Sequence, residues 1–186
     1  LGRARSQRYG TPEAMGRTAV VNLDAHFDLR EAPEPSSGTP FLQMAQAEQE
    51  AGRGLDYTVI GIAESSNTAV LFDAARSLGA TWLLDVDSTE EAAVAAVDKV
   101  LARADHVHLE IDLDVLPADI APGVSAPAAY GVPMRACGAV VRRLAASGKL
   151  RVVDVAEYNP SVDVDSRTAK AAARLVTDIV HALPGE

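Results

Sequence analysis

Two short stretches of the sequence place acidic and imidazole side chains at alternating positions. The first contains Asp24, His26 and Asp28 and follows an apolar run, residues 19–23, that predicts a buried β-strand. In extended backbone, residues i, i+2 and i+4 point to the same side, so we expect these side chains to converge at the strand end. Carboxylate oxygen and imidazole nitrogen are ligands that suit Mn²⁺, Zn²⁺ or Fe²⁺.

The second stretch ends a strand predicted over residues 106–113, where Asp112 and Asp114 alternate with apolar residues and share a face. Either motif by itself also occurs in solvated loops. The pair favours a metal site, because ligand sites collect at the carboxyl ends of strands in open α/β sheets. Five candidate ligands suit two ions about 3.5–4 Å apart, the arrangement that activates water for hydrolysis. The candidates are Asp24, His26, Asp28, Asp112 and Asp114.

Strand-like and helix-like segments alternate along the whole chain. Short apolar, β-branched runs predict strands over residues 19–23, 57–62, 81–84, 106–113 and 152–156. Segments bounded by capping residues and glycines predict helices over residues 41–51, 68–78, 134–147 and 166–183, and a further helix that opens with residues 88–91 and extends to about residue 103. The alternation predicts one α/β domain over residues 1–186, in which a parallel sheet lies between two layers of helices.

Two helix starts carry specific capping signals. Asn67 precedes the helix predicted from residue 68, and we expect its side chain to cap that helix. Ser88 and Glu91 have the spacing of a capping box for the following helix, in which each side chain bonds the other residue's backbone N–H.

Composition limits the classes of function. The chain has 186 residues, of which 48% are hydrophobic and 23% charged, as in ordinary globular proteins. A net charge of −9 argues against a nucleic-acid partner, and no run of 18 apolar residues predicts a membrane span. Cys137 is the single cysteine, so an intramolecular disulfide is excluded, which is consistent with a reducing cytoplasm. We expect Cys137 to be a small buried apolar group.

The two metal-type motifs and their surroundings resemble the ureohydrolases, the arginase and agmatinase superfamily. The resemblance rests on Asn-Leu-Asp-Ala-His-Phe-Asp-Leu-Arg at 22–30, Ile-Asp-Leu-Asp-Val-Leu-Pro at 111–117, and the segments 121–127 and 157–160. Phe-Asp-Leu-Arg after the histidine, Ser-Ser-Asn-Thr at 65–68 and the run from Val115 to Pro127 are most similar to the formimidoylglutamase branch. The similarity extends from about residue 18 to residue 182.

The resemblance implies an arginase/deacetylase-like fold and two Mn²⁺ ions bound by the five candidate ligands. By analogy with the family, Asp28 relays a proton to the departing nitrogen. Glu157, at the end of the last strand, is placed to pair with an amidinium group. Arg30 is suited to clamp a substrate carboxylate, and Ser37 in the adjacent loop to assist it. Alternatively, Arg30 pairs with Glu31 or Glu34, or Glu157 is a surface residue before a turn.

The implied reaction is hydrolysis of N-formimidoyl-L-glutamate to L-glutamate and formamide, in histidine degradation in the cytoplasm. The implied partners are a small-molecule amidine and further copies of the same chain. One alternative is a guanidino-group hydrolase of the agmatinase or guanidinobutyrase type. The absence of a histidine near Phe41 speaks against arginase itself. Another alternative is a catalytically inactive metal-binding or assembly subunit, or an inactive fragment.

The sequence departs from the family pattern near its start. The family takes a sixth metal ligand from a histidine upstream of the first motif, and this sequence has no histidine before His26. We therefore expect an N-terminally truncated domain, in which residues 1–17 form a mid-domain helix or loop instead of a targeting segment. His108 shares a predicted strand face with Asp112, but we expect it to be structural.

Overall fold

The computed structural model describes residues 16–185, so residues 1–15 of the predicted mid-domain helix or loop lie outside the described part. Within that part, parallel strands form one sheet in the order β3-β2-β1-β4-β5. Because the strands are parallel, their carboxyl ends meet at one edge. The strands are β1 (Thr18–Leu23), β2 (Asp56–Ile62), β3 (Thr81–Leu84), β4 (His106–Asp112) and β5 (Leu150–Ala156).

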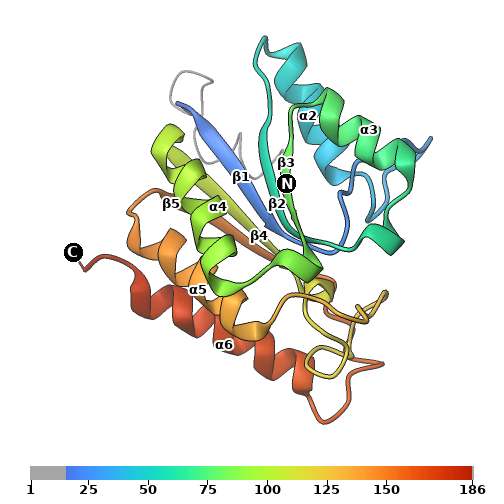
Figure 1. The fold of residues 1–186 in the computed structure, drawn as a ribbon, viewed down its shortest axis with the longest axis vertical. Coiled ribbons are helices and arrows are strands. Elements are labelled where there is room, and N and C mark those ends of the chain that lie inside the picture. Colours follow the sequence, from blue (N-terminus) through green and yellow to red (C-terminus); the bar gives the residue numbers. More distant parts are fainter. Residues whose placement is uncertain (1–15, 186) are drawn as a thin grey trace.

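Helices cover both faces of this sheet (Figure 1). In the described residues, α2 and α3 pack on one face, and α4, α5 and α6 pack on the other. The predicted three-layer α/β fold is therefore confirmed, and the observed ends of helices and strands lie within about two residues of the predicted ones. The helices are α2 (Pro40–Glu50), α3 (Ala69–Ser77), α4 (Glu90–Arg103), α5 (Met134–Ala146) and α6 (Arg167–Ala182).

Strand β1 lies at the centre of the sheet, and every one of its residues is buried. Val21 and Leu23 pack with the α4–α6 layer, while Val20 packs with the α2–α3 layer. A strand buried on both faces requires a nearly continuous apolar run, which explains the sequence Thr-Ala-Val-Val-Asn-Leu. Asn22 is the exception in this run, and its side chain faces the α2 side.

Aromatic packing holds the loop that follows β1. Phe27 meets Phe72 of α3 and Trp82 of β3 edge to face, with ring centroids 5.0 Å and 5.4 Å apart. Because Phe27 is fully buried, this contact ties the segment carrying the first metal-type motif to the core. The single cysteine, Cys137, is buried as predicted. In the described residues, no helix has both the length and the apolar character needed to cross a membrane.

Both capping predictions were wrong in detail. Thr68, not Asn67, is the N-cap of α3, and the Asn67 side chain bonds the backbone around the first motif instead. Thr89 is the N-cap of α4 and accepts a hydrogen bond from Ala92 N, while Ser88 Oγ donates to Leu84 O. In both cases a neighbouring polar residue had the same local signal, and tertiary contacts decided between the two.

Gly131, near the end of the long loop after the second motif, packs directly against the backbone of that motif at Leu116 and Pro117. Its φ is +67°, and a Cβ atom there would lie 2.5 Å from Pro117 N and 2.7 Å from the carbonyl carbon of Leu116. Backbone cannot move aside as a flexible side chain does, so only glycine fits this contact. Gly148, after α5, has a similar φ of +70° with nothing within 4 Å of such a Cβ.

These two glycines give a matched test of the fold. We expect Gly148→Ala to lower the free energy of unfolding by about 1–2 kcal/mol, the cost of left-handed backbone. Gly131→Ala has the same cost plus a clash with backbone, so we expect a loss above about 3 kcal/mol. Urea unfolding of both variants measures the difference, and equal losses would contradict the close approach at Gly131.

Candidate metal centre

The two metal-type motifs lie at neighbouring strand ends, where the chain leaves extended backbone. β1 ends at Leu23, and the following residues bend, with Asp28 at a φ of +52°. Asp112 is the last residue of β4, and Asp114 lies in a 3₁₀ turn, η4 (Leu113–Val115). The prediction that extended backbone continues through each motif was therefore wrong, because the chain turns within both motifs.

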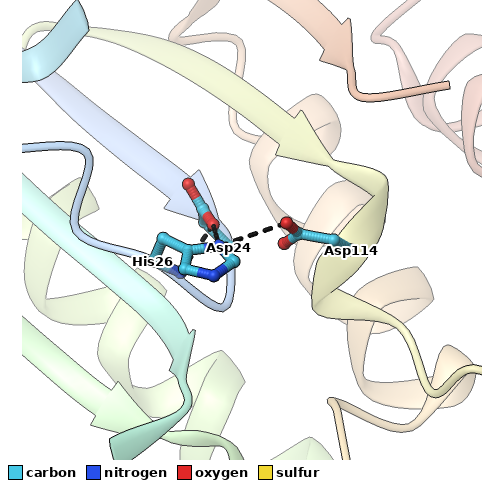
Figure 2. Close-up of side chains that lie close together, drawn as sticks. All are labelled: Asp24, His26 and Asp114. Carbon is cyan, nitrogen blue, oxygen red and sulfur yellow. Dashed lines mark hydrogen bonds and ion pairs between the residues drawn. The ribbon is translucent and has the colours of Figure 1, made fainter. Parts of the chain in front are cut away.

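The turns nevertheless bring three of the predicted ligands together. His26 Nδ1 lies 3.1 Å from Asp114 Oδ2 and 3.5 Å from Asp24 Oδ1 (Figure 2). One potential ligand atom from each of Asp24, His26 and Asp114 lies within 4.8 Å of the others. Ala25 N also donates to Asp114 Oδ1 at 3.4 Å, so backbone and side chains join the two motifs.

The other two predicted ligands border the same space. Asp28 and Asp112 both line the cavity that His26 and Asp114 face, but they are outside the tight group of three. Asp112 Oδ1 accepts a hydrogen bond from Asp114 N at 3.0 Å, which fixes the turn between the two carboxylates. The structure therefore gathers all five predicted ligands at one edge of the sheet, with three of them in mutual contact range.

Burial makes the negative charge of these clustered carboxylates unfavourable, and without a metal ion only protons can neutralise that charge. Burial, with repulsion from neighbouring carboxylates, raises the pKa of Asp24 to about 6, of Asp28 to about 8 and of Asp112 to about 11. Hydrogen bonds to Asp114 and Asp24 raise the pKa of His26 to about 10. Carboxylate oxygens and an imidazole nitrogen crowded in this way fit a divalent cation, which neutralises the charge that burial opposes.

A cavity of about 180 Å³ opens beside the acidic group. Its lining includes the three residues that were predicted to contact substrate, Arg30, Ser37 and Glu157. Glu157 follows β5 directly, has a φ of +64°, and accepts a hydrogen bond from Ser125 Oγ at 2.6 Å. Glu157 thus faces the cavity and is oriented there by a second loop. This position favours a role in the site over the alternative that Glu157 is a surface residue before a turn.

Arg30, the predicted carboxylate clamp, lies on the wall of this cavity. It lines the cavity and its guanidinium lies beside Gly38, where a Cβ atom would come within 3.6 Å of Cζ. Arg30 N also donates to Gly38 O at 2.9 Å, so the loop that carries Ser37 folds back on Arg30. Among the described residues, no ion pair joins Arg30 to Glu31 or Glu34, the alternative partners.

His108 takes no part in the cavity. Its side chain is buried, and Nε2 lies 2.7 Å from Asp154 Oδ2 on the neighbouring strand β5. The register pairs His108 with Val152 and Glu110 with Asp154, so His108 reaches diagonally across the two strands. The prediction that His108 is structural agrees with this position.

Sequence reasoning missed several residues that shape the site. Ser66 and Ser125 line the cavity, although only their segments had been noted. Asn22 and Asn67, both buried, bond the loop that carries the first motif. A signal for Asn22 was present, because a buried strand rarely contains an amide without a specific partner. For Asn67 the local capping signal pointed elsewhere.

The pKa shifts predict how pH and metal affect stability. A folded-state carboxyl pKa above its unfolded value, or a raised histidine pKa, makes the folded state weaker as pH rises. Asp24, Asp28, Asp112 and His26 all act in this direction, so we expect the metal-free chain to lose stability from about pH 4, the ordinary carboxyl pKa, up to about pH 11, the folded pKa of Asp112. Mn²⁺ at 100 times its Kd should restore about 2.7 kcal/mol at pH 8, and less at pH 6, because protons compete with the ion.

Thermal unfolding with Mn²⁺ or with excess EDTA measures both effects. Asp112→Asn removes one buried carboxylate and keeps its shape, so this variant should lose most of the gain in Tm from Mn²⁺. Asp119→Asn changes an exposed carboxylate outside the cavity and should keep the gain in full. An equal gain in both variants would show that Mn²⁺ binds elsewhere.

Comparisons with known proteins identify the family of this chain. A family model described as Arginase family matches residues 3–182. A formimidoylglutamase from Nocardia farcinica is 55% identical over 180 residues, which cover 97% of this chain and 56% of the relative. A formimidoylglutamase from Rhodococcus jostii is 50% identical over 192 residues, covering 97% and 60%. The chain thus spans little more than half the length of these relatives.

Solved structures share the fold. Formiminoglutamase from Trypanosoma cruzi, whose structure contains Mn²⁺, superposes with a TM-score of 0.85 at 24% identity, covering 98% of this chain and 61% of that one. Formimidoylglutamase from Bacillus subtilis superposes with a TM-score of 0.83 at 23% identity, covering 96% and 57%. At these identities the likeness shows the three-layer fold, and the family model shows the relationship. This chain belongs to the Arginase family.

Proposed function

We propose that the protein is a formimidoylglutamase: a binuclear manganese hydrolase that converts N-formimidoyl-L-glutamate and water to L-glutamate and formamide. One observation carries this proposal. A single cavity is bordered by a carboxylate–imidazole group (His26, Asp28, Asp112 and Asp114), by Glu157 and by Arg30. The first suits metal-assisted hydrolysis, the second an amidine, and the third a substrate carboxylate. The Nocardia farcinica and Rhodococcus jostii relatives carry the same activity in their names, which supports the proposal.

The metal site of the proposal consists of Asp24, His26, Asp28, Asp112 and Asp114. Two Mn²⁺ ions, when bound, lower the pKa of water towards neutrality and so supply hydroxide at pH 7. The residues contribute four carboxylates and one imidazole, the hard and borderline ligands that Mn²⁺ accepts. Asp24, Asp112 and Asp114 are buried, and the low polarity around them strengthens the electrostatic attraction between ligands and ions.

Asp28 is the proposed proton carrier. In the reaction, water adds to the amidine carbon, and the bond from that carbon to the glutamate nitrogen then breaks. The departing nitrogen needs a proton, which comes from the attacking water. A carboxylate beside both the metal ligands and the substrate space is suited to pass that proton on. Asp28 also lines the cavity, so its side chain borders the substrate space.

Glu157 is the proposed partner of the amidinium group. Two parallel N–H donors of an amidinium match the two oxygens of a carboxylate. The hydrogen bond from Ser125 Oγ occupies Glu157 Oε2 and restricts rotation of the carboxylate. Glu157 therefore orients the trigonal carbon of the substrate towards the carboxylate–imidazole group.

Arg30 and Ser37 form the proposed carboxylate site. Formimidoylglutamate has two carboxylates, whereas agmatine has none, so a cation at the cavity wall favours the first substrate. Arg30 provides a planar donor pair for bidentate binding, and Ser37 lies on the same wall. This feature separates the proposal from the guanidino-hydrolase alternative.

The family resemblance extends the proposal to the setting of the enzyme. We propose that it acts on a small-molecule amidine in histidine degradation, in the cytoplasm, as a homo-oligomer. The net charge of −9 is consistent with a partner other than nucleic acid.

The direct test is formamide release by the purified chain loaded with Mn²⁺, with metal content measured in the same sample. We expect two ions per chain and one formamide for each glutamate formed, because hydrolysis of the C–N bond produces both together. The Nocardia farcinica relative, assayed in parallel, is the positive control. Metal binding without formamide, beside an active control, would favour a metal-binding or assembly subunit instead.

Replacing Arg30 by Ala tests the substrate. Loss of a charge-assisted hydrogen-bond pair costs about 1.5–3 kcal/mol, so kcat/KM for formimidoylglutamate should fall about 10- to 100-fold. Hydrolysis of agmatine, which has no carboxylate for Arg30, should change little. Steady-state kinetics on both substrates measure the contrast.

Arg30→Lys and Arg76→Ala are the matched controls. Lysine keeps the charge but not the planar fork, so it should recover only part of the lost rate. Arg76 is an exposed arginine of α3 paired with Asp73, away from the cavity, and its loss should leave both substrates unaffected. An equal loss on agmatine and formimidoylglutamate in Arg30→Ala would contradict the carboxylate site.

A further inference from the structure

Asn22 is a fully buried amide that bonds a predicted metal ligand. It lies on β1 two residues before Asp24, and its Nδ2 donates to Asp24 Oδ2 at 2.9 Å and to Tyr57 OH at 3.0 Å. The hydrogen-bond network fixes which end of the amide is nitrogen. Tyr57 OH already donates to Phe27 O at 3.0 Å and so acts as an acceptor towards Asn22, while an ionised Asp24 accepts only.

Tyr57 gives this contact a rigid support. The residue is 1% exposed on β2, and its ring stacks on Phe41 of α2 with centroids 4.6 Å apart. Its hydroxyl joins Asn22 to the backbone of Phe27, in the loop between His26 and Asp28. The position of Asp24 Oδ2 is therefore set by two strands and by the loop that carries the other ligands.

The other oxygen of Asp24, Oδ1, lies towards His26, another of the predicted metal ligands. Asp24 Oδ1 accepts a hydrogen bond from His26 N at 2.6 Å and lies 3.5 Å from His26 Nδ1. Asn22 thus bonds Oδ2 of Asp24, while Oδ1 remains on the side of His26.

Burial of the Asn22 side chain also costs free energy of folding. Its Oδ1 is buried with no hydrogen-bond partner among residues 16–185. A leucine there would extend the apolar run of β1 without this cost. The side-chain hydrogen bonds of Asn22 in the described part therefore run through Nδ2, to the ligand Asp24 and to Tyr57.

We propose that Asn22 and Tyr57 are positioning residues that hold the Asp24 carboxylate in the orientation that binds metal. This inference rests on the proposed metal site and deepens it. Partners that orient metal ligands commonly change metal affinity about 10- to 100-fold when removed. Neither side chain lines the cavity, so neither is expected to touch the substrate.

The test is Mn²⁺ affinity of the whole chain, measured by titration calorimetry on Asn22→Leu and Tyr57→Phe. Asn22→Leu should weaken binding about 10- to 100-fold. Tyr57→Phe keeps the stacked ring and removes only the support, so its loss should be smaller. The double variant should lose less than the two losses combined, because both act on the same oxygen. The visible absorption of bound Co²⁺ should change in the same variants, since it reports ligand geometry.

Thr58→Val is the matched control for loss of a buried hydroxyl from β2. Thr58 Oγ1 lies 2.9 Å from Thr81 Oγ1 on β3, away from the site, so this variant should keep wild-type affinity. Urea unfolding without metal separates stability from binding. Wild-type affinity in both Asn22→Leu and Tyr57→Phe would overturn the inference, and if Asn22→Leu fails to fold, Tyr57→Phe decides.

The same experiment separates this inference from the proposed function. If the wild-type chain binds Mn²⁺ without hydrolysing formimidoylglutamate, the proposed activity fails, while the affinities of the variants still decide the role of Asn22. If the wild-type chain binds no Mn²⁺, both are overturned.

Discussion

Burial of carboxylates at the end of a parallel sheet is the constraint on which the rest of this structure depends. Asp24, Asp112 and Asp114 lie at the ends of buried strands, so their side chains are inside the protein. A buried negative group is costly unless a cation or a proton neutralises it. The raised pKa values of Asp24 and Asp112 express this cost, and a divalent cation would remove it.

The loop after β1 needs unusual support because it departs from regular structure where the ligands lie. Asn67 accepts a hydrogen bond from Phe27 N and donates to Ala25 O and Ala63 O, which replaces the missing strand ladder. Phe27 then anchors the loop between aromatic rings. The Asn67 amide and aromatic packing together let the backbone turn sharply while Phe27 N and Ala25 O keep hydrogen-bond partners.

The cavity joins this acidic edge to groups from three separate loops. Arg30 comes from the loop after β1, Ser125 from the long loop after β4, and Glu157 from the end of β5. Loops at the carboxyl edge of a parallel sheet supply such groups because the sheet holds the loop ends at fixed positions. Chemistry and substrate recognition are thus carried by different segments on one rigid frame.

Much of this arrangement is encoded locally. The apolar run of β1, the alternation of strands and helices, and the Asp-x-His-x-Asp and Asp-x-Asp motifs are local patterns. They predicted the fold and the acidic and imidazole residues at the strand ends, whereas Ser66 and Ser125 of the cavity were missed. Local patterns did not predict the conformation of the motifs. Strand alternation suggested one shared face, but Asp28 adopts positive φ and Asp114 lies in a 3₁₀ turn.

The sequence by itself determined which elements form, which strand ends carry acidic groups and to which family the motifs point, because these follow from hydrophobic periodicity and short-range spacing. Tertiary structure decided which ligands meet, as in the 3.1 Å contact between His26 and Asp114, which are 88 positions apart. It also decided that Asn67 supports the loop after β1 instead of capping α3, and that Asn22 bonds Asp24 and Tyr57. Such choices depend on contacts between distant segments, and these exist only once the sheet has assembled.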